Sequence, residues 1–150
     1  MARKYRQGVF IPKFPKKYVG DASNIVYRSS WELKFMNWCD INESVLLWCS
    51  EEVVIPYYSR ADEKTRRYFT DFMIKYKGAD GQVKAALIEI KPDAQTREPV
   101  AKRGKKAARL LEETYTYMVN QDKWEAARAF AKKNGMEFMV LTEHDLGIKK

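Results

Sequence analysis

Hydrophobic positions recur with two different periods along the chain, and the change of period separates predicted helices from predicted strands. In the first third of the chain, Trp31, Phe35 and Trp38 recur at helical spacing. Later runs are rich in β-branched and aromatic residues, which favours strands. The pattern predicts a helix at 29–42, strands at 45–48, 53–57, 68–76 and 83–90, helices at 102–119 and 122–133, and a strand at 136–141.

Turn-forming residues mark the boundaries between these segments. The sequence GADG at 78–81 lies between two apolar runs and predicts a β-hairpin. Pro92 ends the second strand of that hairpin, Gly135 stands where a helix C-cap is expected, and polar residues 59–67 predict a loop. The order of helix, four strands, two helices and a strand predicts an α/β fold, a mixed β-sheet flanked by helices.

Composition and charge narrow the classes of partner. The chain has 150 residues, 45% of them hydrophobic, which suits one domain with a packed core. Lys and Arg outnumber Asp and Glu by 28 to 20, and a net charge of +8 favours polyanions, nucleic acid first. An acidic protein or an anionic membrane remains an alternative. No apolar run is long enough to span a membrane, and no export signal follows the charged N-terminus, so a non-secreted, soluble protein is expected.

Basic side chains gather in two stretches, an acid-poor N-terminal segment and a cluster after the predicted hairpin. With its prolines and glycines, segment 1–22 is expected to form an extended or flexible basic arm. We expect both stretches to contact the phosphate backbone of DNA, although a solubilising tail and a solvated helix face are the simpler interpretations. The candidates are Lys13, Lys16, Lys17, Arg28, Lys102, Arg103, Lys105, Lys106 and Arg109.

Cysteine and histidine offer little chemistry. Cys39 and Cys49 lie in apolar stretches, which is typical of reduced core residues. Together with His144, the one histidine, they are too few for a four-ligand Cys/His zinc site. His144 is expected at the surface, and the helical spacing around Trp124 predicts that this side chain is part of the core.

Two acidic residues stand inside the apolar strands of the predicted hairpin. Asp71 lies within the sequence FTDFMI, and Glu89 precedes Lys91 by two positions, so Glu89 and Lys91 point to the same face. Direct closure of the hairpin would pair Asp71 with Ile88, and a one-residue bulge would pair it with Glu89. Either register brings the two carboxylates close together. A solvated cross-strand pair of acid and lysine is the simpler alternative, but the apolar neighbours argue against it.

Two neighbouring carboxylates repel each other unless one is protonated or a cation lies between them. Oxygen ligands on a rigid frame suit magnesium or manganese. Lys91 beside such an ion could stabilise an attacking hydroxide or the charge that builds up on a phosphate. Glu32 has a different interpretation on sequence alone, because Ser29 to Glu32 spell a helix capping box.

These acids and their spacing resemble the PD-(D/E)xK nuclease superfamily, which has the restriction-endonuclease-like fold. The resembling positions are Glu32, Asp71, Glu89 and Lys91, and Thr70 replaces the Pro of the motif. The blocks 27–32, 68–72, 88–92 and 123–127 are similar to the endonuclease subunit of heteromeric transposases. The layout from about residue 5 to residue 146 is also similar to the head completion nucleases of T-even type tailed phages.

The resemblance implies metal-dependent hydrolysis of DNA phosphodiesters by a single domain, 1–150. Asp71, Glu89 and the carbonyl of Ile90 would bind magnesium or manganese, Lys91 would position and activate the water, and Glu32 would complete the site. It further implies processing of DNA ends after packaging, with phage head or portal proteins as partners, in the host cytoplasm during virion assembly.

Two alternatives stay open. One is a structural head protein or DNA-binding protein that uses a nuclease scaffold without cutting, because a fold does not establish an activity. The other is a transposase or repair endonuclease subunit. The sequence leaves the oligomeric state open.

Overall fold

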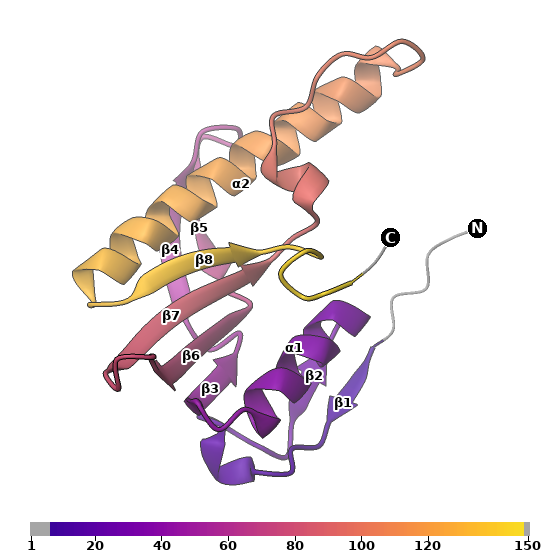
Figure 1. Cartoon of the computed structure of the whole chain (residues 1–150). Helices are drawn as coiled ribbons and strands as arrows, with labels where there is room; N and C mark the ends of the chain where they lie inside the picture. The colour runs from indigo at the N-terminus through magenta and orange to yellow at the C-terminus, as the bar shows by residue number, and fades with distance from the viewer. Residues whose placement is uncertain (1–6, 149–150) are drawn as a thin grey trace.

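A four-stranded mixed sheet forms the centre of the protein, which the computed structural model describes over residues 7–148 (Figure 1). The strand order is β3-β6-β7-β8, with antiparallel pairing except between β7 and β8, which run parallel. The strands of this sheet are β3 (Val45–Ser50), β6 (Phe72–Lys77), β7 (Val83–Ile90) and β8 (Glu137–Leu141).

Two antiparallel strand pairs and two helices cover the two faces of this sheet. Helix α1 lies on one face together with the β1–β2 pair, and helix α2 lies on the other face with the β4–β5 pair (Figure 1). Two 3-10 turns, η1 and η2, complete the fold. The bounds are β1 (Gly8–Phe10), η1 (Pro15–Lys17), β2 (Ile25–Tyr27), α1 (Ser30–Ile41), β4 (Val54–Ser59), β5 (Lys64–Phe69), η2 (Asp93–Thr96) and α2 (Ala107–Lys133).

The alternation of side chains along β7 divides the core into two clusters. Ala86 and Ile88 face α1, whereas Leu87 between them packs with Trp124 of α2. Glu89 is two residues after Leu87, so its side chain points to the same face, the α2 side of the sheet. The predicted mixed sheet flanked by helices is therefore confirmed, and so is the core position of Trp124.

The last helical region is one helix where the sequence predicted two. The polar stretch around residue 120 does not break α2, because it contains neither Gly nor Pro and because Asn120 and Asp122 are buried. The prediction that residues 102–106 begin this region as a helix is wrong. They form a turn in which Gly104 has a φ of +87°, a left-handed conformation that favours glycine.

The predicted loop at 59–67 is largely wrong as well, because residues 64–69 form β5. Only Tyr68 is buried along this strand, so its sequence carries no hydrophobic pattern that would reveal it. The predicted strand at 68–76 is accordingly interrupted. β5 ends at Phe69, and Thr70 and Asp71 separate it from β6.

The part of the predicted basic arm that the structure describes is folded onto the protein. Phe10 and Tyr18 are buried in the cluster beneath α1, and the Tyr18 ring meets Trp48 edge-on at 4.7 Å between ring centroids. The prediction of an extended or flexible arm is thus wrong for residues 7–22, whose apolar residues are core residues. Residues 1–6 of the arm lie outside the described residues.

Both cysteines are free and buried, as predicted, and burial raises the pKa of both thiols. His144 is exposed, also as predicted. Within residues 7–148, no helix is long and apolar enough to cross a membrane.

Candidate active site

Asp71 and Glu89 meet at the end of the β6–β7 hairpin that lies opposite its turn. Phe72 pairs with Ile88, so the next residue on each strand, Asp71 and Glu89, come together. One carboxylate oxygen of Asp71, Oδ2, accepts a hydrogen bond from the backbone N–H of Ile90 at 2.8 Å. Of the two registers expected from the sequence, the one that faces Asp71 toward Glu89 is observed.

The hairpin turn explains this register. Lys77 pairs with Val83, and the N–H of Gly78 donates to the carbonyl of Gln82. The turn therefore uses one residue more than direct closure at Gln82 would need. The extra residue shifts every pair along the hairpin by one position, which brings the two acids together.

Burial and mutual repulsion make this pair difficult to ionise. Glu89 is 5% exposed, and burial raises the pKa of its carboxyl group. Burial, followed by the negative charge of Glu89, raises the pKa of Asp71 to about 8. A cation between the two groups would favour their ionised forms.

The two carboxylate oxygens of Glu89 have different partners. Oε2 accepts a hydrogen bond of 2.5 Å from the hydroxyl of Tyr68, which projects from β5. Oε1 lies 3.8 Å from the ammonium nitrogen of Lys91, which confirms that Glu89 and Lys91 share a face. Tyr68 and Lys91 together hold the orientation of the Glu89 carboxylate.

Three residues near this pair, Tyr68, Lys123 and Glu51, had no role assigned from the sequence. Lys123 of α2 places its ammonium nitrogen 5.5 Å from the centre of the Tyr68 ring. Glu51, directly after β3, donates its backbone N–H to the carbonyl of Asp71 and has a φ of +54°. The hydrophobic pattern gives no signal for Tyr68 or Glu51, because both act through polar atoms in irregular or mostly exposed segments.

Glu32 approaches from α1, which covers the opposite face of the sheet. Ser29 is the N-cap of this helix, and its hydroxyl accepts a hydrogen bond from the N–H of Glu32. The carboxylate of Glu32 accepts a hydrogen bond from the backbone N–H of Arg28 at 3.3 Å. In a standard capping box this donor would be the N–H of Ser29, so the capping interpretation holds with the donor one residue earlier. Burial raises the pKa of Glu32, whose charge also contributes to raising the pKa of Asp71.

The donor set fits a magnesium or manganese ion in part. Asp71 and Glu89 supply two adjacent carboxylates on strand ends, and hard oxygen ligands are the type that both ions prefer. In the described part of the chain, however, no three His, Cys, Asp or Glu side chains are gathered closely enough to hold a metal ion. The structure thus brings Asp71, Glu89 and Lys91 together, but it does not bring Glu32 into a three-carboxylate cluster.

The basic residues of the N-terminal segment divide into exposed and engaged side chains. Lys13 and Lys16 are exposed. Lys17 instead donates from Nζ to the carbonyls of Asp40 and Asn42, at 2.9 and 2.8 Å, at the C-terminus of α1. The Lys17 side chain is therefore engaged by the protein itself, and its contact with DNA phosphate stays a prediction.

Arg28 is similarly engaged, because its guanidinium pairs with the carboxylate of Glu51. This ion pair lies next to the candidate site, since the backbone N–H of Glu51 binds the carbonyl of Asp71. Arg28 is still more than half exposed, so its position leaves part of the guanidinium open to solvent.

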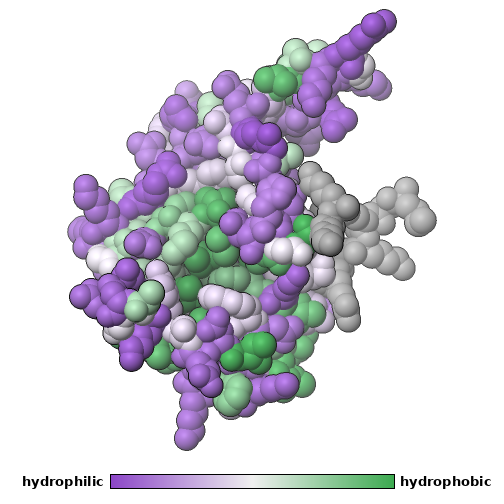
Figure 2. Space-filling view, viewed as in Figure 1, coloured by the Kyte–Doolittle hydropathy of each residue, from purple (hydrophilic) through white to green (hydrophobic). Residues whose placement is uncertain are grey.

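The second basic cluster occupies the segment between η2 and α2 and the first turn of α2. This segment projects beyond the sheet together with the N-terminal half of α2, and its surface is mostly hydrophilic, with a small hydrophobic spot near the tip (Figures 1 and 2). Lys102, Arg103 and Lys106 are exposed, whereas Lys105 and Arg109 both pair with Glu113. The segment follows Lys91 closely in the chain, so the cluster is tethered to the candidate site.

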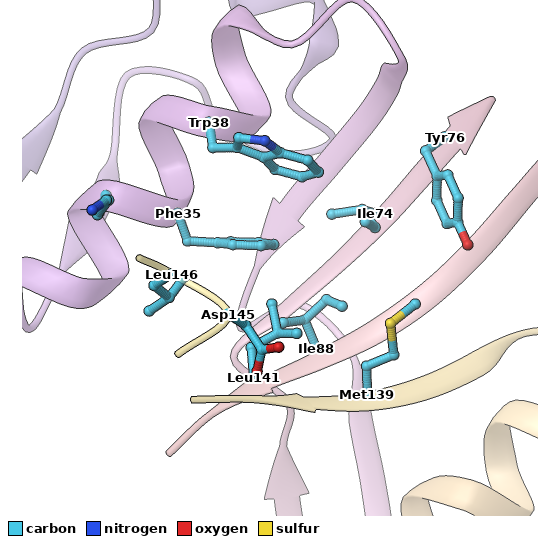
Figure 3. Close-up of a pocket in the computed structure, with 10 residues that line it drawn as sticks. Phe35, Trp38, Ile74, Tyr76, Ile88, Met139, Leu141, Asp145 and Leu146 are labelled. Atoms are coloured by element: carbon cyan, nitrogen blue, oxygen red, sulfur yellow. The ribbon is translucent and has the colours of Figure 1, made fainter. Parts of the chain in front are cut away.

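A pocket of about 390 Å³ lies elsewhere, between α1 and the open face of β6, β7 and β8. Phe35 and Trp38 extend from α1 toward Ile74 and Met139 on the sheet (Figure 3). Its walls are mostly apolar, and a hydrophobic hollow is visible on this face of the molecule (Figure 2). Because Asp71 and Glu89 do not line it, this pocket is separate from the candidate site.

Two comparisons with known proteins identify the family of this chain. The family model for the TnsA-like endonuclease N terminal domain matches residues 42–143, a range that contains Asp71, Glu89 and Lys91. The head completion nuclease of Enterobacteria phage T4 is 43% identical over 142 residues, which cover 93% of this chain and 92% of that protein. Both resemblances inferred from the motifs are confirmed. The chain therefore belongs to the TnsA-like endonuclease family, whose domain has the restriction-endonuclease-like fold.

Proposed function

We propose that this protein is a metal-dependent deoxyribonuclease of the PD-(D/E)xK type that acts in the completion of phage heads. Membership of an endonuclease family supports a nuclease. The observation that carries the finer proposal is the pair formed by half-buried Asp71 and buried Glu89, adjacent to Lys91 and difficult to ionise without a cation.

Asp71 and Glu89, with the carbonyl of Ile90, are the proposed ligands of magnesium or manganese. Such an ion, when bound, would polarise a phosphate oxygen and lower the pKa of water. Lys91 lies 3.8 Å from Glu89 Oε1, where its ammonium can hold the attacking water and offset negative charge on the phosphate. Glu32, on the α1 side of the strand ends, is proposed to complete the site.

The proposed reaction balances as an ordinary hydrolysis. The water oxygen forms a bond to phosphorus, and the bond from phosphorus to one sugar oxygen breaks. The water loses one proton and the leaving sugar oxygen gains one, so the products are a phosphate-monoester end and a hydroxyl end. The role of Lys91 and of the carboxylates is to orient the water and to stabilise charge in the transition state.

DNA is the proposed substrate, held through its phosphates. The exposed side chains Lys13, Lys16, Lys102, Arg103 and Lys106 are free to contact a backbone without reading sequence. A net charge of +8 supports the same substrate.

The similarity to the phage T4 protein is the basis for a proposed biological role. The T4 protein is named a head completion nuclease, and it is similar to this chain over nearly the whole of both. We therefore propose that this protein processes DNA ends after packaging, in the host cytoplasm during virion assembly, with head or portal proteins as partners.

A cleavage assay tests the proposal directly. Linear and supercoiled DNA are incubated with the protein in Mg²⁺, in Mn²⁺ or in EDTA, using wild type, Lys91→Met and Asp71→Asn. Lys84→Met is the matched control, because Lys84 is an exposed lysine at the other end of β7. We expect metal-dependent cutting by wild type and the control, and loss of cutting in the two site variants.

DNA binding in EDTA and calorimetric binding of Mn²⁺ complete the test. Asp71→Asn should lose Mn²⁺ affinity and keep DNA binding. A wild-type protein that binds DNA but never cuts would favour the structural DNA-binding alternative. Cutting that survives both site substitutions would show that the catalytic site lies elsewhere.

A further inference from the structure

Lys123 lies on the side of the candidate site that faces α2. It belongs to the buried stretch of this helix, directly before Trp124, which packs with Leu87 and Tyr68 in the core. Its ammonium nitrogen lies over the ring of Tyr68, 5.5 Å from the centroid. The hydroxyl of the same tyrosine donates to Glu89, so one aromatic ring connects Lys123 to the proposed metal ligand.

We propose that Lys123 is a second catalytic lysine, whose ammonium contacts a non-bridging oxygen of the phosphate that is cleaved. This inference rests on the proposed function. Among residues 7–148, Lys123 has no carboxylate within 4.0 Å, although it is half-buried. A half-buried ammonium without a close ion pair retains the capacity to bind an anionic ligand.

The electrostatic surroundings of Lys123 agree with this position. Burial, followed by the positive charge of Lys91, lowers the pKa of Lys123, and the charges of Glu89 and Asp71 act in the opposite direction. Lys123 thus interacts electrostatically with Lys91, Glu89 and Asp71 alike. Lys91 directly follows β7 and Lys123 belongs to α2, so an anion between them would be contacted from two directions.

Two lysines would divide the work of the site. Lys91 is 3.8 Å from Glu89 Oε1 and is assigned to the attacking water. The phosphate gains negative charge as the water attacks, and a second ammonium held over the Tyr68 ring would offset that charge. The Tyr68 ring restricts where this ammonium can lie, which lowers the cost of orienting it during the reaction.

A structural role for Lys123 gives a different expectation. A cation over an aromatic ring at a partly exposed site contributes only a small stabilising free energy. If this contact were the sole purpose of Lys123, its replacement would lower thermal stability slightly and would leave the cleavage rate of the folded protein unchanged.

The test compares Lys123→Gln and Lys123→Arg with Lys132→Gln, an exposed lysine on the same helix. The cleavage rate is measured in single-turnover conditions with enzyme in excess and Mg²⁺ present. The dissociation constant for the same DNA is measured in EDTA, and the fraction folded is measured by thermal melting.

We expect Lys123→Gln to cut about 10²–10³-fold more slowly, with a dissociation constant within about threefold of wild type. Lys123→Arg should recover part of the rate, and Lys132→Gln should match wild type. If wild type cuts and Lys123→Gln cuts at the same rate, or slows only in proportion to its unfolded fraction, Lys123 is not catalytic. A wild-type protein that does not cut overturns the proposed function itself and this inference with it.

Discussion

The hydroxyl of Tyr68 donates a hydrogen bond of 2.5 Å to Oε2 of Glu89, which joins the β4–β5 hairpin to the central sheet at the candidate site. Tyr68 is the one buried residue of β5, so this contact ties a mostly exposed strand to the central sheet through a buried side chain. Burial and the charge of Glu89 raise the pKa of the Tyr68 hydroxyl, which favours the protonated form that donates to Glu89. The hairpin thus acts on the site by orienting a carboxylate.

Tyr68→Phe should weaken metal binding while keeping the packing of the ring. The variant loses the bond that favours the ionised form of Glu89, whose pKa then rises further. Loss of a partner to a metal-binding carboxylate typically costs about 10–100-fold in affinity or activity. The expected result is a correspondingly higher Mg²⁺ concentration for half-maximal cleavage, measured by titration of the cleavage rate.

Tyr57→Phe is the matched control for this substitution. Tyr57 is buried in the neighbouring strand β4, and its ring meets that of Tyr68 edge-on at 6.5 Å between centroids. Removing its hydroxyl leaves the bond between Tyr68 and Glu89 in place. If both variants shift the Mg²⁺ requirement equally, the effect belongs to the hairpin as a whole and Tyr68 has no specific role.

Asp71 should make the metal-free protein less stable as the pH rises. Its pKa is raised from an ordinary value of 3.8 to about 8 by burial and by the charge of Glu89. Between these pH values the folded protein holds a proton that the unfolded chain has released. The stability linked to this group is therefore complete below about pH 4 and is lost as the pH rises through about 8.

Asp71→Asn removes this titration and should make the protein in EDTA more stable than wild type at pH 8. The amide that replaces the carboxylate can still accept the N–H of Ile90 through its oxygen. Adding Mg²⁺ should raise the melting temperature of wild type at pH 8 and leave the variant unchanged. Glu125→Gln, an exposed change on α2, controls for the loss of one negative charge. Identical melting curves for Asp71→Asn and wild type from pH 4 to 8 would contradict the assignment.

The hydrophobic pattern was sufficient for the central sheet because its strands have a buried face. The strands of the β6–β7 hairpin, the last strand and the first helix lie close to the predicted ranges. Strand β5 was missed because five of its six residues are exposed, and its one buried residue acts through a hydroxyl. The break in α2 was predicted in error, because polar Asn120 and Asp122 face the protein interior.

The candidate site was predictable as far as it depends on strand register. Asp71, Glu89 and Lys91 are linked by hairpin geometry, which sequence spacing determines within one residue. Tyr68 and Lys123 come from segments far away in the sequence, and tertiary packing alone brings them to the carboxylates. The hydrogen bonds of Lys17 could not be predicted from the sequence for the same reason, since their acceptors are backbone carbonyls at the end of α1.

Replacing Lys17 should lower the stability of the protein, whereas replacing Lys16 should affect DNA binding alone. Lys17→Met loses two hydrogen bonds to backbone carbonyls at the end of α1, which we expect to cost about 1–2 kcal/mol of unfolding free energy. Lys16→Met changes an exposed side chain and should leave stability within about 0.5 kcal/mol. Urea unfolding measures both changes. If DNA affinity falls more in Lys17→Met than in Lys16→Met, then the bonds to the helix do not prevent Lys17 from contacting phosphate.

Lys102 and Arg103 should contribute to DNA affinity in a way that salt reveals. Both side chains are exposed on the segment that projects beyond the sheet, and neither pairs with an acid among the described residues. Each phosphate contact adds about 0.9 to the slope of log affinity against log salt concentration. The double variant Lys102→Ala, Arg103→Ala should therefore bind DNA more weakly at low salt, with a slope reduced by about 2.

The control for that measurement removes the same charge at the opposite end of α2, where Lys132 and Lys133 are exposed. The helix has 27 residues, so at about 1.5 Å per residue these lysines lie about 40 Å from the projecting segment. Beyond a Debye length of about 10 Å, their charge has little influence on phosphates bound there. Fluorescence anisotropy over a range of salt concentrations measures both slopes. Equal slopes for the two double variants would mean that DNA responds to the total charge of the protein, and the projecting segment would then have no special contact with the backbone.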